Sequence, residues 1–130
     1  MAERFFRRYI LGNIRWLTGI YLLILVLGSL LPLNNGTSLN HTFIVEVRSD
    51  YFLHFLMMLP LTVLLGLTFR SRSGTWWRVL LLGLIVVVFC EGIQLLIPYR
   101  AFNINDMFAN GLGALMGLIP AWLIWRRFST

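Results

Sequence analysis

The chain has 130 residues, of which 58% are hydrophobic and only 12% are charged, and its formal net charge is +6. Soluble domains usually carry about 25% charged residues, so this composition excludes an ordinary soluble domain. The positive charge comes entirely from arginine and lies beside apolar segments. This distribution indicates a lipid surrounding rather than a nucleic-acid partner. The single cysteine, Cys90, excludes an internal disulfide.

Four apolar stretches predict helices over about residues 16–33, 51–69, 76–97 and 106–125. Each is close to the roughly 20 residues that a membrane-spanning helix needs. Backbone groups in lipid have to be satisfied within the segment, so helix is the expected state. No small-x-small cleavage site follows the first stretch, so we expect it to be retained and not removed as a signal peptide. The prediction is an all-α fold, a single membrane domain over residues 1–130 that forms a four-helix bundle.

The arginines predict the orientation of the bundle. They precede the first helix, surround the turn between the second and third, and follow the fourth; only Arg48 and Arg100 lie in the other two connections. By the positive-inside rule, both the N and C termini are then cytoplasmic. All five tryptophans fall at the same helix ends, as expected of an interfacial belt.

Two further patterns concern packing. The segment "HTFIVEVRSD" before the second helix alternates apolar and polar residues, which predicts a short strand or an interfacial segment. In the fourth helix, Ala109, Gly113 and Gly117 recur at four-residue spacing, which allows a close approach of two helices. A contact within the bundle is favoured over a homodimer, which remains the alternative.

Polar residues gather at the predicted outer ends of three helices, and Arg100 lies in the loop between the last two. The helical pairs, each spaced for one face, are Asp50 with His54, Glu91 with Gln94, and Asp106 with Asn110. At 1.5 Å per residue, Glu91 is expected roughly 10 Å inward from its helix end. Asp50 and Asp106 are equally explained as helix caps, His54 as an interfacial histidine, and Arg100 as a loop charge. A carboxylate at the position of Glu91, by contrast, costs several kcal/mol unless it is paired, protonated or hydrated.

The segments "SDYFLHF" and "EGIQLLIPYRAFNINDMFANGLGALMG" together resemble the VanZ family of bacterial membrane proteins. The matching positions are Asp50, His54 and Phe55; Glu91 and Gln94; Pro98 and Arg100; and Asp106, Asn110 and Gly113. Tyr51 departs from the pattern, because many members carry lysine there. The resemblance implies a multi-pass protein of the bacterial cytoplasmic membrane and a link to low-level teicoplanin resistance. It brings no agreed enzymatic activity.

Three functions follow as hypotheses. In the first, the cluster binds a cell-envelope ligand, such as a lipid-linked cell-wall precursor or a glycopeptide; Arg100 holds an anionic group, and Asp50, Gln94 and Asn110 orient the rest. In the second, Glu91, His54 and Asp106 are catalytic, with Glu91 as general acid or base paired with His54. Alternatively, Asp50, His54, Glu91 and Asp106 together hold a divalent cation. The sequence assigns no definite metal site and identifies no cofactor. In the third, the protein is a structural or assembly partner, and transport ranks lowest.

Overall fold

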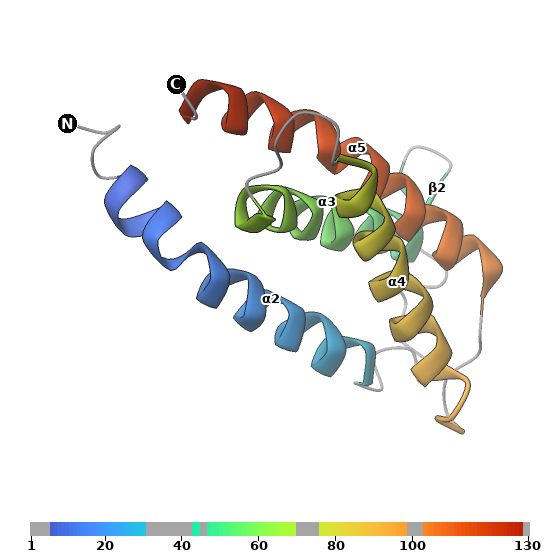
Figure 1. Cartoon of the computed structure of the whole chain (residues 1–130). Helices are drawn as coiled ribbons and strands as arrows, with labels where there is room; N and C mark the ends of the chain where they lie inside the picture. The colour runs from blue at the N-terminus through green and yellow to red at the C-terminus, as the bar shows by residue number, and fades with distance from the viewer. Residues whose placement is uncertain (1–5, 31–42, 45–46, 70–75, 99–102, 129–130) are drawn as a thin grey trace.

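The structure, a computed structural model of the chain, describes residues 6–30, 43–44, 47–69, 76–98 and 103–128 (Figure 1). A π-helical segment, η1 (Phe6–Leu11), leads into the first of four long α-helices. These are α2 (Gly12–Leu30), α3 (Ser49–Phe69), α4 (Trp76–Gln94) and α5 (Ile104–Phe128). Each helix is long and apolar enough to cross a membrane. The all-α prediction with four spanning helices is therefore confirmed.

The helix bounds differ from the predicted ones most informatively in α4. This helix ends at Gln94 and not at Ile97, and the chain then turns, with the Ile97 N–H donating to the Gln94 carbonyl at 3.1 Å. Pro98 explains the early end, because the residue before a proline disfavours the helical region. Glu91 consequently lies about 5 Å from the helix end by the helical rise, and the expected depth of roughly 10 Å was wrong.

A minimal strand pair precedes α3. β1 (Phe43–Ile44) and β2 (Val47–Arg48) are antiparallel, with Phe43 opposite Arg48 and Ile44 opposite Val47. The described residues of the alternating segment thus form two very short strands, where its sequence predicted a single short strand or an interfacial segment.

The closest helix contact joins α3 and α5, which run side by side in the same direction (Figure 1). Gly113 lies directly against the Phe55 carbonyl, and a Cβ on Gly117 would come within 2.7 Å of the Leu59 carbonyl oxygen and of the Thr62 Cβ. Only residues without a bulky side chain allow two backbones this close. The glycine spacing is therefore used inside the bundle, where it sets the position of α5 on α3.

The other two helices run in the opposite direction and flank this pair. α2 is held to α3 by a 2.6 Å hydrogen bond between the Thr18 and Thr68 hydroxyls and by the Tyr21 hydroxyl, which donates to the Met57 carbonyl at 2.8 Å. Apolar side chains fill the space between the helices; the buried cluster is Leu25, Met58, Leu61, Leu65, Val79 and Val87. The buried acidic and amide side chains lie outside this apolar middle, toward one end of the helices.

The two ends of the bundle differ in chemistry. The start of α2, the end of α3 and the end of α5 lie toward the same end (Figure 1). The start of α4 belongs to this end as well, because the Trp76 ring lies against Gly66 near the end of α3. The arginines whose side chains are described all lie there, namely Arg8, Arg15, Arg78, Arg126 and Arg127. Trp76 and Trp125 pack edge to face at this end, with ring centroids 6.1 Å apart. The acidic and amide side chains described next lie at the opposite end.

Candidate functional site

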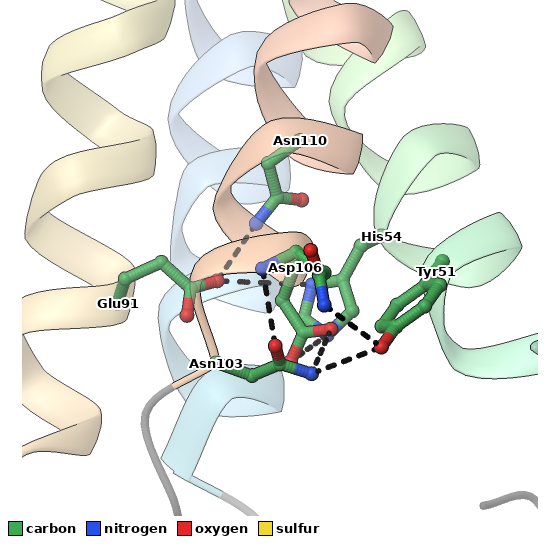
Figure 2. A network of polar contacts seen from close by, with 7 residues as sticks. Tyr51, His54, Glu91, Asn103, Asp106 and Asn110 are labelled. Atoms are coloured by element: carbon green, nitrogen blue, oxygen red, sulfur yellow. Dashed lines mark hydrogen bonds and ion pairs between the residues drawn. The ribbon is translucent and has the colours of Figure 1, made fainter.

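The polar side chains of three helices meet at the end of the bundle that lacks the described arginines (Figure 2). Because α4 runs against α3 and α5, its last turn lies beside their first turns. Four of the polar residues buried there come from α4 and α5, and they are Glu91 and Gln94 of α4 and Asp106 and Asn110 of α5. Buried charged and amide groups cost free energy unless they are paired, so this group requires partners. We call these four residues, together with His54 of α3, the polar cluster.

The most buried contact of the polar cluster joins α4 to α5. The Asn110 amide donates to Oε1 of Glu91 at 2.8 Å, and the two residues are only 2% and 1% exposed. Oδ1 of Asn110 is also buried and accepts no hydrogen bond from the part of the chain that the structure describes. Asn110 therefore fixes one carboxylate oxygen of Glu91.

His54 lies between two carboxylates. Its Nδ1 is 3.8 Å from Oε1 of Glu91, and its Nε2 is 3.7 Å from Oδ2 of Asp106. These separations are longer than a hydrogen bond but fall within the range of an ion pair when the imidazole is protonated. The His54 side chain is 21% exposed, against 2% for Glu91 and 9% for Asp106. The imidazole is thus the most exposed of these three side chains, and the two acids lie deeper.

A second layer of hydrogen bonds forms a rim on the outer side of the polar cluster, as Figure 2 shows. The side-chain amides of Asn103 and Asn105 both donate to the Tyr51 hydroxyl, at 3.4 and 3.3 Å. Asn103 also donates to Oδ1 of Asp106 at 3.2 Å. The rim, consisting of Tyr51, Asn103 and Asn105, connects the start of α3 to the start of α5 and contacts the buried acids through Asp106.

Asn103 has a second role as the N-cap of α5. Its side-chain oxygen accepts the N–H of Asn105 at 3.0 Å, and its carbonyl accepts the N–H of Asp106 at 3.1 Å. An amide oxygen at this position satisfies an N–H of the first turn that has no helical partner. Asp106 is therefore not the cap, although its position in the sequence also allowed that role. Its carboxylate points toward His54 and Asn103.

The structure brings together His54, Glu91, Asp106 and Asn110, as the sequence predicted, with Gln94 buried at the same end of α4. Asp50 lies in the first turn of α3, but its side chain is outside the described part of the chain, as is all of Arg100. The sequence analysis did not assign Tyr51, Asn103 or Asn105 to the site. Two features of the sequence could have identified them. Tyr51 and His54 are three residues apart, and an asparagine lies just before a predicted helix.

A metal ion is not supported by the residues that the structure describes. No group of three histidine, cysteine, aspartate or glutamate side chains among them is arranged to hold one. Although His54, Glu91 and Asp106 are neighbours, the acids lie on different sides of the imidazole ring. The side chain of Asp50, the fourth acidic or imidazole group that the sequence suggests for this site, lies outside the described part of the chain.

Comparison with known proteins assigns nearly the whole chain to one family model. A model described as VanZ/LLP1 matches residues 13–126, a range that includes the polar cluster and the rim. No curated protein and no solved structure matches the chain.

Proposed function

The chain belongs to the VanZ family of membrane proteins, and on this premise we propose that the polar cluster and its rim bind the head group of a lipid-linked, anionic cell-envelope molecule. The observation that carries the proposal is the layered arrangement at one end of the helices. An accessible rim of amide and phenol groups covers an imidazole and two acids held by three different helices. Helix ends lie near the depth of lipid head groups, so such a ligand reaches this site without leaving the membrane.

Different groups of the site bind different parts of the ligand. Tyr51, Asn103 and Asn105 offer donors and acceptors at the rim, which suit sugar hydroxyls or peptide amides. Asp106 and Glu91 repel a phosphate, because like charges at short range are unfavourable. We therefore assign the anionic group to Arg100, only three residues before Asn103 in the sequence, since a guanidinium binds phosphate or carboxylate with two parallel hydrogen bonds.

In the proposed orientation, the site lies at the outer face of the bacterial cytoplasmic membrane. The described arginines lie at the opposite end of the bundle, and the positive-inside rule assigns that end, with both termini, to the cytoplasm. Alkaline phosphatase fused after Thr130 should be inactive, while a fluorescent protein fused there should fluoresce. An active phosphatase fusion would reverse the orientation and remove the site from the outer face.

This location connects the site to glycopeptide resistance, because teicoplanin acts on lipid-anchored cell-wall precursors at the outer face. In cells that depend on this protein for growth in teicoplanin, Arg100→Ala should lower the inhibitory concentration to that of cells without the protein. Asn105→Ala should have a smaller effect in the same direction. The matched control is Arg126→Ala, because Arg126 lies at the other end and stacks on Trp122 at 5.3 Å. Full resistance with Arg100→Ala at normal expression would refute the proposal.

A second candidate function is supported by the position of His54 between Glu91 and Asp106. An imidazole flanked by two acids can take a proton from a bound hydroxyl or amine and pass it to a carboxylate, which is the work of a general base. A membrane enzyme acting on the same lipid-linked molecule would use these three residues as its catalytic group. Purified protein incubated with a lipid-linked cell-wall precursor, followed by mass spectrometry, separates the two functions. An enzyme forms a product that His54→Gln does not form, whereas a binding protein returns the precursor unchanged.

A further inference from the structure

The N-terminal part of the first spanning segment carries a row of exposed residues that the proposed function does not use. Arg8, Gly12 and Arg15 are exposed and follow one another at spacings of four and three residues, which places them on one side of the helical segment formed by η1 and α2. Tyr9 and Trp16 occupy the next positions and are 54% and 76% exposed. We call these five residues the arginine row.

The two arginines of the row have no acidic partner in the part of the chain that the structure describes. The ion-pair contacts there join His54 to Glu91 and to Asp106, at the opposite end of the bundle. The Arg8 guanidinium lies 5.8 Å from the centroid of the Tyr9 ring, within the range of a cation–π contact. A guanidinium that stacks on a ring still has its N–H groups in its own plane, where they can donate to an anion.

The arginine row lies at the depth of lipid head groups. The 19 residues of α2 rise about 28 Å, close to the roughly 30 Å of a bilayer core, so α2 alone spans the core. η1 therefore extends past the core, and Arg8 lies at head-group level. Arg15 lies about 5 Å inside the start of α2 by the helical rise, and a long arginine side chain reaches the interface from there. Because the row is exposed on a spanning segment, the molecules around it are lipids.

We propose that the arginine row binds the phosphate of an anionic phospholipid, in the leaflet that this end of the bundle reaches. Arg8 and Arg15 are about 10 Å apart along the helix, and their long side chains donate to one phosphate from two sides. A Cβ on Gly12 would have nothing within 4 Å, so the phosphate approaches the helix backbone between the two arginines. Tyr9 and Trp16 lie beside it, as amphipathic rings do at a membrane interface.

The same arginines select lipids by charge. Phosphatidylcholine carries a trimethylammonium group, which the two guanidinium groups repel, whereas phosphatidylglycerol carries only the negative phosphate. The site lies at the opposite end of the bundle from the polar cluster. The inference therefore goes beyond the proposed function and does not depend on it.

The experiment measures binding of phosphatidylglycerol, and of phosphatidylcholine with the same acyl chains, to the detergent-solubilised full chain by native mass spectrometry. Arg8→Gln and Arg15→Gln should each weaken phosphatidylglycerol binding roughly fivefold and leave phosphatidylcholine binding unchanged. Gly12→Leu keeps the charge and should weaken phosphatidylglycerol binding by about the factor of one arginine, because one phosphate then reaches only one guanidinium. The matched control is Arg127→Gln on α5, which removes an exposed arginine at the same end and should stay within about twofold of wild type.

Each other outcome overturns the inference or a stated part of it. Equal binding of the two lipids to the wild type would refute selection by charge. Unchanged phosphatidylglycerol binding in Arg8→Gln and Arg15→Gln would show that these arginines only orient the chain in the membrane. An equal loss in Arg127→Gln would mean that the total charge of this end, and not the arginine row, attracts the lipid. An unchanged affinity in Gly12→Leu would refute a single phosphate held between the two arginines.

Discussion

The hydrogen bond between Asn110 and Glu91 provides the sharpest quantitative test of the polar cluster. It joins α4 to α5 at 2.8 Å between residues that are 2% and 1% exposed. Hydrogen bonds to charged groups contribute about 1.5–3 kcal/mol. Interhelical bonds in membranes average only about 0.6 kcal/mol and reach about 1.7 kcal/mol, because the unfolded chain in lipid also finds partners. The short, fully buried geometry places this bond at the upper end of the membrane range, so we expect a coupling free energy of about 1.5 kcal/mol.

The measurement is a double-mutant cycle with Asn110→Leu and Glu91→Leu, each of which removes one partner and adds no new hydrogen bond. Reversible unfolding in mixed micelles of increasing SDS content, followed by circular dichroism, gives the free energy of unfolding of the four proteins. Asn105→Leu is the control, since Asn105 is exposed and its loss should cost less than about 0.5 kcal/mol. A coupling below about 0.5 kcal/mol is indistinguishable from additivity. That result would mean that Glu91 is held by other groups and that Asn110 does not position it.

Three further predictions concern the bundle and the imidazole. Gly117→Val should lower the free energy of unfolding by on the order of 3 kcal/mol, because its Cβ would come within 2.7 Å of α3. The control is the same substitution at Gly19, which should change the free energy of unfolding by less than about 0.5 kcal/mol. Thr18→Val removes the 2.6 Å bond to Thr68 at the far end and should cost about 0.6–1 kcal/mol without lowering teicoplanin resistance; a loss of resistance would contradict the assignment of function to the other end. His54→Leu should abolish resistance yet change the free energy of unfolding by less than about 1 kcal/mol, because the side chain is partly exposed and its ion-pair contacts are long. A loss of resistance that is accompanied by a loss of folded protein would indicate a structural role.

Much of the candidate site could be predicted from the sequence, because its members occupy helix ends at regular spacing. His54, Glu91, Asp106 and Asn110 were identified from polar positions within apolar stretches, and all four meet in the structure. Tyr51 was noted only as the loss of a lysine, although its hydroxyl accepts hydrogen bonds from both rim asparagines. The hydrogen-bond partners of a hydroxyl group depend on which segment lies opposite it. The sequence of one helix alone does not give that information.

The sequence by itself determined the class of protein and the number of spans. Apolar length and the need to satisfy backbone groups in lipid are properties of each segment alone, so local composition was sufficient. Only the tertiary structure decided that α3 and α5 are the closest pair. That pairing depends on Gly113 and Gly117 fitting against particular carbonyls of α3, a shape match between segments more than 50 residues apart. The same pairing, with α4 antiparallel to it, brings an imidazole within ion-pair range of two acids. The sequence could not predict this, because helical periodicity says which residues share a face but not how far apart two helices lie.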